Sequence, residues 1–526
     1  MDHPVVRQVV NDIKSVPLFV WPLLPVVAVV LYLAAGAVSH AHLNRFPGPK
    51  TAALTRWWLA SQSRKGVRSV KVHEQHQKHG KFVRIGPTEV SIADPAALPI
   101  IYAHGNGALK TDFYDAFVSI HRGLFNTRDR AQHTRKRKIV SHTFSQKSVQ
   151  EFEPYIAATI RELVNKWDGL AKKNTATSGN MKGYAVIDTL DWFNALAFDI
   201  IGDLAFGKPF GMLERDGADV VAIAQEDGTT KYAPAVKILN ERGEYSSTMG
   251  SLPVWIRPYM RYVDPWYARG FKSVNDLAGI ARHRVAERLQ EGSGDRKDIL
   301  AHLLAAKDGE GKPMPRTELT AEALTQLIAG SDTTSNSSCA ILYYIVKNPR
   351  AHKKLQQELD QHIGEKGLSG VLEYEDVKNL PYLQACINEA LRRHSTSGMG
   401  LPRLMVQDTE VCGQYFKAGT VLSVPSYTIH HLEEVWGDPM EFRPERWLED
   451  GNKDLEKALN VFSYGPRSCV GRNVAMMELL LFMSTLTYRY DFKLVDPNME
   501  LEVVEGFLRK PLGCKMGLKL RETAKA

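Results

Sequence analysis

One cysteine near the C-terminus stands in a loop whose composition suits a ligand better than a crosslink. Residues 462–471 read Phe-Ser-Tyr-Gly-Pro-Arg-Ser-Cys-Val-Gly, so Cys469 lies between two glycines and closely follows an arginine. The apolar stretch Val474 to Leu486 predicts a helix directly after the loop. Backbone amides, a helix N-terminus and a cation stabilise a thiolate, and glycines let the backbone approach a flat ring. A buried, inert cysteine is the alternative for a cysteine taken alone, but the register predicts a metal-ligating thiolate.

Length and cysteine usage predict one large body in a reducing compartment. The 526 residues suggest several domains, yet no internal repeat and no linker interrupts the middle of the chain. The five cysteines are odd in number, widely spaced and without a CxxC pair: Cys339, Cys386, Cys412, Cys469 and Cys514. We therefore expect neither a disulfide framework nor a structural zinc site.

The N-terminus predicts a membrane anchor. Residues 16–38 carry no charged side chain, and a helix needs roughly 20 residues to cross a bilayer. A cleaved signal peptide is the alternative, because Ala34 to Ala37 are small. Basic residues are more frequent after the segment than before it, which places the body on the cytosolic side. The prediction is a single-pass anchor over 1–45 and a catalytic domain over 46–526 that faces the cytosol.

The basic composition does not by itself identify a partner. The net charge is +8, and residues 135–138 read Arg-Lys-Arg-Lys. Because no recognition motif or aromatic platform adjoins this run, we expect no nucleic acid partner. A basic surface suits an anionic membrane or an acidic protein equally well.

Hydrophobic periodicity predicts a mainly α-helical body with a minor β-sheet. Alternation around Gly86-Pro87 predicts a β-hairpin over 82–92, and short strands are expected after Leu401. Residues 231–269 have few helix signals and many prolines and aromatics, which predicts a mobile lid over a pocket or an ordinary surface loop. Helices are predicted over residues 129–144, 149–171, 190–206, 274–291, 318–347, 349–363 and 382–393.

A second motif, Ala329-Gly330-Ser331-Asp332-Thr333-Thr334, lies inside the longest predicted helix. A glycine beside a small residue lets a flat group lie against the helix, and adjacent acid and hydroxyl groups can relay protons. Taken alone, the hexamer is more simply a polar patch with helix-distorting hydroxyls. Beside the Cys469 loop, it predicts the second half of one site.

These two motifs resemble those of the cytochrome P-450 superfamily of haem-thiolate monooxygenases, and the resemblance runs from about Phe46 to the C-terminus. It implies the P-450 fold with an N-terminal transmembrane helix, haem b as cofactor and dioxygen as co-substrate. Cys469 would ligate the iron, within a loop that includes Phe462 and Gly471. Gly330 would widen a groove for dioxygen. Asp332 and Thr333 would guide protons to it.

The same resemblance implies supporting residues around the haem. Glu389 and Arg392, three apart on one helix, would form a buried network with Arg446 that braces the cysteine loop. Four residues would hold the haem propionates: His133, Arg137, Arg403 and Arg467. Four more would face outward, as a docking surface for an acidic NADPH-dependent flavoprotein reductase or as a merely solvated face: Arg130, Arg135, Lys136 and Lys138.

Shorter stretches are similar to the fungal benzoate 4-monooxygenases. They comprise residues 122–129, 133–138, 199–207, 394–397 and 400–403. Ser395 stands where most of the superfamily has proline. The likeness implies an enzyme of the endoplasmic reticulum membrane that converts benzoate to 4-hydroxybenzoate. Ser395, Thr396 and Ser397 would be the chief donors to the substrate carboxylate, with Arg122 secondary.

Two alternatives to this function stay open at the level of sequence. One is a monooxygenase of the same fold that acts on another hydrophobic molecule, such as a fatty acid, a terpenoid or a toxin precursor. The other is a haem protein that senses or carries a ligand without turnover. The adjacent Asp332 and Thr333 argue against the second alternative, because a carrier needs no proton relay.

Overall fold

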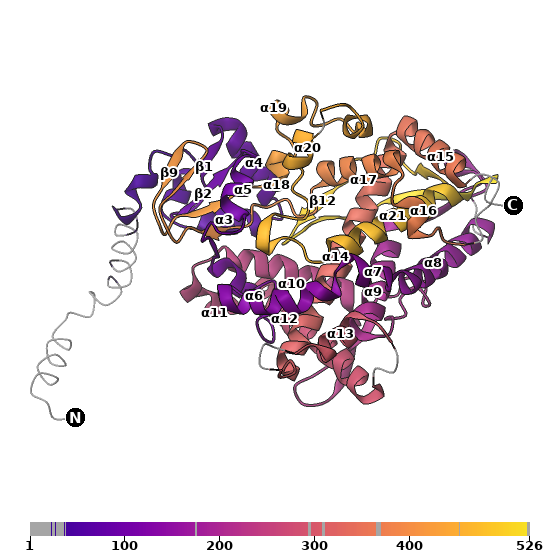
Figure 1. Cartoon of the computed structure of the whole chain (residues 1–526), viewed down its shortest axis with the longest axis horizontal. Coiled ribbons are helices and arrows are strands. Elements are labelled where there is room, and N and C mark those ends of the chain that lie inside the picture. The colour runs from indigo at the N-terminus through magenta and orange to yellow at the C-terminus, as the bar shows by residue number, and fades with distance from the viewer. Residues whose placement is uncertain are drawn as a thin grey trace, which may run out of the picture.

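Helix α14, Arg316–Lys347, runs through the middle of the molecule and packs against α9, α12, α17 and α21 (Figure 1). This computed structural model describes residues 38–173, 176–292, 296–307, 311–363, 370–451 and 453–522, together with Leu23, Val27 and Gly36. Long helices surround α14: α6 Arg130–Thr143, α8 Glu153–Lys173, α9 Thr189–Phe206, α10 Ala235–Gly250, α12 Pro265–Glu291, α15 Pro349–Ile363, α17 Pro381–His394 and α21 Arg472–Arg489. The shorter helices are α3 Trp57–Arg64, α4 Arg68–His79, α5 Ala97–Tyr102, α7 Gln146–Gln150, α11 Arg257–Met260, α13 Ile299–Ala305, α16 Tyr374–Val377, α18 Ser426–Ile429, α19 Glu433–Trp436 and α20 Lys453–Ala458.

Most predicted helices are confirmed, and local caps explain where they begin and end. The Asp129 side chain accepts a hydrogen bond from the Gln132 N–H at 2.8 Å and starts α6. Helix α9 ends at Gly207, whose φ of 85° is a left-handed C-cap. The single helix predicted over 149–171 is instead two helices, because α7 ends at Gln150 and α8 begins at Glu153.

The segment 231–269 is largely helical, which contradicts the predicted loop. It contains α10, η5 (Val254–Ile256), α11 and the start of α12. Close packing explains the difference, because a Cβ at Gly250 would lie 2.5 Å from Phe113 Cδ2, and one at Gly270 would lie 2.4 Å from Tyr245 Cβ. Tertiary contacts thus stabilise a helix that weak local propensity does not indicate.

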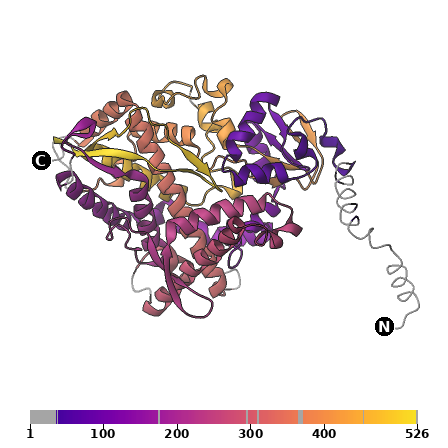
Figure 2. The ribbon, with the colours of Figure 1, turned by 180° about the vertical axis from the view of Figure 1, so that it is seen from behind.

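A five-stranded sheet lies beside the helical body, at the end of the molecule that also carries α3 and α4 (Figures 1 and 2). Its order is β1 (Phe82–Arg84), β2 (Glu89–Ile92), β10 (Val421–Ser423), β7 (Arg403–Leu404) and β3 (Leu109–Lys110). The predicted hairpin is confirmed, with Phe82 opposite Ile92. Strands β3 and β7 place Lys110 opposite Arg403. The smaller sheets pair β4 Ala185–Asp188 and β11 Tyr490–Leu494 with β14 Lys515–Leu520, β5 Val220–Ala224 with β6 Thr230–Pro234, β8 Thr409–Val411 with β9 Gln414–Phe416, and β12 Val503–Glu505 with β13 Arg509–Pro511.

The folded body begins before Phe46. Leu43 is buried in the core of the sheet region, and Asn44 Oδ1 accepts a hydrogen bond from Arg84 Nη1 at 2.7 Å. The predicted anchor over 16–38 lies outside the described residues except for Leu23, Val27, Gly36 and Val38. Within the described ranges, no helix is both long and apolar enough to span a bilayer.

Candidate active site

The Cys469 loop joins η8, Gly465–Arg467, to the N-terminus of α21. The Cys469 N–H donates to the Phe462 carbonyl at 2.8 Å and closes the loop. Gly465 has φ 68°, and a Cβ there would lie 2.0 Å from the Tyr102 carbonyl oxygen, so only glycine fits. Gly471 differs, because its φ is −84° and the nearest atom to a Cβ would be 3.9 Å away. A side chain at position 465 would therefore clash with neighbouring protein atoms, whereas one at position 471 would not.

The surroundings of Cys469 act in both directions on its ionisation. The Cys469 side chain is accessible at its surface. The protein atoms around it still exclude bulk water, and this desolvation raises the pKa of the thiol. The Gly471 N–H and the charges of Arg137 and Arg472 act to lower that pKa. A bound metal ion would complete the change, because a coordinating thiol is deprotonated.

Helix α14 exposes one face in the middle of its course. Ala329 is exposed and Thr333, one turn later, is half-buried, whereas Leu327, Ser331 and Ser335 are buried. The Thr333 hydroxyl donates to the Ala329 carbonyl at 2.5 Å. Accessible side chains at the centre of an otherwise buried helix indicate an internal space along this face.

Gly330 does not open that space in the way the sequence predicted. A Cβ at Gly330 would lie 2.7 Å from Ile201 Cδ1, so its side-chain direction faces α9. The glycine lets α14 and α9 cross closely, and the small residue at the accessible face is Ala329.

The polar residues of the α14 motif point to different neighbours. Burial raises the pKa of Asp332, against the charges of Lys510 and Arg242 and a 2.8 Å hydrogen bond from Asn336 Nδ2. The Thr334 hydroxyl instead donates to Glu478 Oε2 of α21 at 2.9 Å. Burial raises the pKa of Glu478 to about 7. No sequence motif had indicated Glu478.

Five basic side chains meet beside the cysteine loop, and we call them the cation cluster: Lys110, His133, Arg137, Arg403 and Arg467. They come from β3, α6, β7 and η8. The guanidinium groups donate mainly to neutral oxygens: Arg137 to the Ser468 carbonyl at 2.6 Å, Arg467 to the Thr127 carbonyl at 2.6 Å, and Arg403 to the Tyr114 hydroxyl at 2.7 Å. Among the described residues, no carboxylate forms an ion pair with the cluster.

The charges of the cation cluster are uncompensated in the protein alone. Burial and then the neighbouring cations lower the pKa of His133 to about 3, so its imidazole is neutral at pH 7 and can serve as a hydrogen-bond donor. They lower the pKa of Arg467 to about 10, so its guanidinium stays charged. Arg403 Nη2 is buried and has no partner among the described residues. Because unpaired buried cations are costly, this geometry fits an anionic group, and a haem with two propionates supplies two negative charges.

Lys110 was missed by the sequence analysis. Its ammonium donates to the Phe125 carbonyl, and burial followed by the charges of Arg403, Arg467 and Arg137 lowers its pKa well below the usual range. No motif surrounds it in the sequence. Only the pairing of β3 with β7 brings it opposite Arg403.

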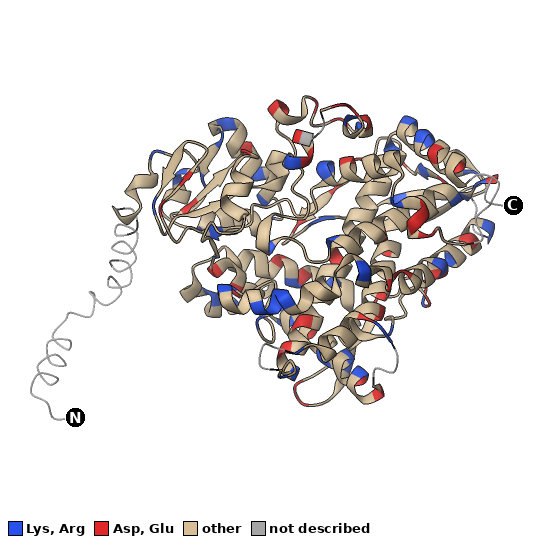
Figure 3. Cartoon of the chain, viewed as in Figure 1, with Lys and Arg blue, Asp and Glu red and all other residues tan. Residues whose placement is uncertain are grey.

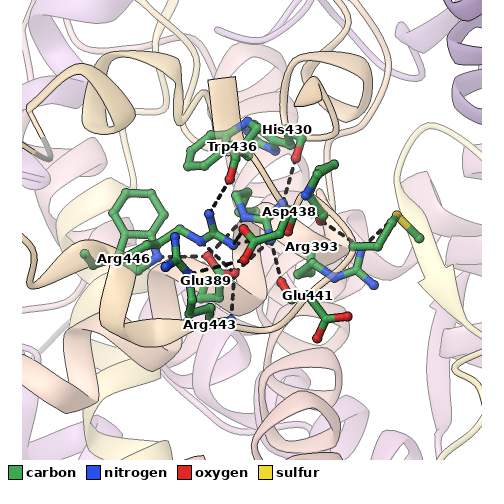
Figure 4. Close-up of polar contacts among 12 residues, drawn as sticks. Glu389, Arg393, His430, Trp436, Asp438, Glu441, Arg443 and Arg446 are labelled. Carbon is green, nitrogen blue, oxygen red and sulfur yellow. Dashed lines mark hydrogen bonds and ion pairs between the residues drawn. The ribbon is translucent and has the colours of Figure 1, made fainter. Parts of the chain in front are cut away.

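The predicted network around Glu389 is present and completely buried (Figure 4). Glu389 accepts from Arg392 Nη2 at 2.8 Å, from Arg446 Nε at 3.1 Å and from Trp447 Nε1 at 3.0 Å. Arg392 Nη1 also donates to the carbonyl of His430 at 2.8 Å. His430 Nε2 in turn accepts from the Asn460 N–H at 2.9 Å, two residues before Phe462. The network thus connects α17 to the start of the cysteine loop.

Two of the three hydroxyls that follow α17 already have hydrogen-bond partners within the protein. Ser395 is buried, caps α17 in a left-handed conformation and lies 2.6 Å from His430 Nδ1. Because His430 Nε2 accepts, Nδ1 carries the proton and donates to Ser395 Oγ. Thr396 Oγ1 is engaged with Ser337 Oγ at 2.9 Å. Ser397 is half-buried and has no hydrogen bond among the described residues. Hence Ser395 and Thr396 serve local structure.

The predicted outward basic surface is present only in part. Arg130 and Lys138 are exposed, and Figure 3 shows the run of basic residues along α6. Lys136 contradicts the prediction, because it is buried and pairs with Glu318 at 2.6 Å and Glu322 at 3.3 Å. Arg135 is half-buried and also pairs with Glu318, at 2.7 Å.

The predicted secondary donor, Arg122, lies at the surface. It lines a cavity of about 1010 Å³ bordered by β3 and the start of α6, and its Nη1 pairs with Asp115 at 2.7 Å. Its side chain is exposed. An exposed arginine that already has a carboxylate partner has little reason to bind a buried substrate.

Three phenylalanines meet at the end of η3, Asp112–Phe117, and we call them the aromatic cluster: Phe117 of η3, Phe125 from the loop before α6, and Phe507 from the turn between β12 and β13. Their ring centroids lie 4.9 to 5.6 Å apart in edge-to-face pairs. Such rings offer an apolar wall that accepts another aryl group.

Comparison with known proteins agrees with this arrangement. A family model described as cytochrome P450 matches residues 47–518. A benzoate 4-monooxygenase of Aspergillus niger is 50% identical over 94% of this chain and 96% of its own length. A cytochrome P450 monooxygenase of Penicillium aethiopicum is 30% identical over 91% of this chain and 94% of its own length. The chain therefore belongs to the cytochrome P450 family of monooxygenases, which use haem, dioxygen and electrons from a reductase.

Proposed function

We propose that this enzyme converts benzoate to 4-hydroxybenzoate, with haem b as cofactor and an NADPH-dependent flavoprotein reductase as electron donor. The observation that carries the proposal is the 50% identity to a benzoate 4-monooxygenase across 94% of the chain. The relatives near 30% identity are named only as cytochrome P450 monooxygenases. The aromatic cluster adds a site for an aryl ring.

Different residues of the chain would bind the cofactor and deliver protons. When bound, haem supplies the activation of dioxygen. Cys469 would hold the iron as a thiolate, and the cation cluster would hold the propionates. Thr333 and Asp332 would pass protons to the face of α14 that Ala329 exposes. One oxygen atom enters the product and the other leaves as water, so each turnover consumes two electrons and two protons.

Product analysis tests the substrate directly. The holoenzyme with a flavoprotein reductase, NADPH and benzoate is expected to form 4-hydroxybenzoate in proportion to the NADPH consumed, and benzoate is expected to shift the haem absorbance before electrons are added. Absence of a shift and of product would refute benzoate as the substrate. Formation of the 2- or 3-hydroxy isomer would refute the position of attack.

Thr333→Ala is expected to keep haem and benzoate binding but to divert electrons to hydrogen peroxide, because proton delivery is lost while binding is not. We expect the product formed per NADPH to fall by about tenfold or more. Ser331→Ala is the matched control, since its buried hydroxyl donates to the Leu327 carbonyl at 2.6 Å on another side of α14. Full coupling in Thr333→Ala would disprove the relay.

We also propose a single-pass anchor in the endoplasmic reticulum membrane, with the catalytic domain in the cytosol. Removing Met1 to Val38 is expected to release the protein from membranes with an unchanged haem spectrum. That truncation keeps Leu43 and Asn44, which belong to the folded body. If the truncated protein sediments completely with membranes, the exposed side chains of η5 and α11, Trp255 and Tyr259, are the next contact to remove.

A further inference from the structure

A buried arginine on α10 has an incomplete set of partners. Arg242 is only 5% exposed. Its Nη2 donates to the Phe117 carbonyl at 2.9 Å, and Asn126 Nδ2 donates to the same oxygen at 3.0 Å. Arg242 Nε is buried without a partner, Nη1 makes no hydrogen bond within the described ranges, and no carboxylate there pairs with the guanidinium. The Arg242 guanidinium can therefore bind an anion without breaking an existing ion pair.

The hydroxyl one turn along α10 is also unpaired. Ser246 is 0% exposed, and its Oγ has no partner in the described part of the chain. Residues four apart lie on the same face of a helix, so Arg242, Ser246 and Gly250 share one face of α10. Gly250 packs on Phe113, and Arg242 packs on Phe117, with its Cζ 5.2 Å from the ring centroid. Arg242 and Ser246 thus face η3 together and offer several N–H donors and one O–H donor.

This face of α10 lies between the aromatic cluster and the α14 motif. Phe117, which contacts the guanidinium, belongs to the aromatic cluster. Arg242 and Asp332 are close enough for each charge to shift the pKa of the other. Burial lowers the pKa of Arg242 to about 10, so the group stays positively charged at neutral pH.

We propose that Arg242 and Ser246 bind the carboxylate of the substrate while its ring lies against Phe117, Phe125 and Phe507. This inference rests on the proposed function, since it assumes an aromatic acid. A planar guanidinium binds a carboxylate through two parallel hydrogen bonds, and a buried hydroxyl adds a third. The position also replaces Ser395 and Thr396, whose hydroxyls are already engaged.

Binding of benzoate and of benzamide, its uncharged analogue of the same shape, tests the assignment. Both ligands are titrated into the full-length holoenzyme and followed by haem absorbance. Arg242→Gln is expected to weaken benzoate by about 100-fold or more and benzamide by no more than about threefold. Ser246→Ala is expected to weaken benzoate roughly tenfold without a comparable effect on benzamide.

Two controls make the result specific. Ser247→Ala removes another buried, unpartnered hydroxyl, but one that points about 100° further round the helix. Arg122→Gln removes the exposed arginine that the sequence indicated as a secondary candidate. Both controls are expected to leave the affinities for the two ligands within about threefold of the wild-type values.

Equal losses for benzoate and benzamide in Arg242→Gln would overturn the carboxylate site and leave the arginine a structural role. If Arg242→Gln fails to take up haem, the test is the benzoate affinity of Ser246→Ala compared with that of Ser247→Ala. Equal benzoate affinities in these two variants would overturn the proposal. A selective loss in Arg122→Gln would also overturn it. Failure of the wild-type enzyme to bind benzoate would refute the proposed function itself, together with this site.

Discussion

Replacing Cys469 with Ala is expected to abolish the thiolate-type spectrum of the reduced carbon monoxide complex and to reduce hydroxylation to background. The loop orients one sulfur between η8 and α21, where the Gly471 N–H and two arginines favour the thiolate. No other described cysteine has such surroundings, because Cys339, Cys386 and Cys514 are buried in the core. Absorbance spectra of the reduced protein with carbon monoxide measure the effect.

Cys412→Ser is the clearest control for this prediction. Cys412 is half-buried in the turn between β8 and β9, outside the Cys469 loop, so its replacement is expected to disturb little packing. Serine at Cys339, Cys386 or Cys514 is also expected to preserve the spectrum. A thiolate-type spectrum that survives in Cys469→Ala would mean that the iron ligand lies elsewhere.

Glu389→Gln is expected to destabilise the protein by roughly 3–5 kcal/mol, because it removes the buried carboxylate that two guanidinium groups share. Arg446 keeps its ion pair with Asp438 at 2.6 Å, but among the described residues Arg392 has no other carboxylate. Arg392 and Arg446 both pair with Glu389, at 2.8 and 3.1 Å. The substitution keeps the volume of the side chain, so the loss reports charge and hydrogen bonding rather than a cavity. Thermal unfolding, monitored together with haem retention, measures the effect.

Glu445→Gln is the matched control, because Glu445 lies in the same η7 segment, Pro444–Trp447, as Arg446. It pairs with Arg350 and Lys354 at the surface, where their side chains are 68% and 48% exposed. Such pairs contribute about 1 kcal/mol or less. If the two variants unfold at the same temperature, the buried network does not brace the cysteine loop.

Features that depend on short stretches of chain could be predicted from the sequence. The cysteine loop, the hairpin around Gly86 and helix α15 follow from local spacing, turn residues and periodicity, and the structure confirms that hairpin and helix. The pairing of Glu389 with Arg392 is also local, since residues three apart share a helix face.

Which side of each element faces the site depends on packing between segments that are distant in sequence. Gly330 turned out to face α9, because a helix crossing is set by a partner distant in sequence. The Ser395 hydroxyl likewise meets a partner distant in sequence, His430, which directly follows α18. Lys136 was buried by two glutamates of α14.

The residues that no motif indicated were found in the same way. Lys110 joins the cation cluster through strand pairing, and Arg242 reaches the aromatic cluster from a helix that the sequence predicted as a loop. Local patterns specify what a segment can form and which chemical groups it carries. The long-range packing of β3 on β7 and of α10 on η3 then determines which of those groups meet, and unpaired buried charge shows where a ligand is needed.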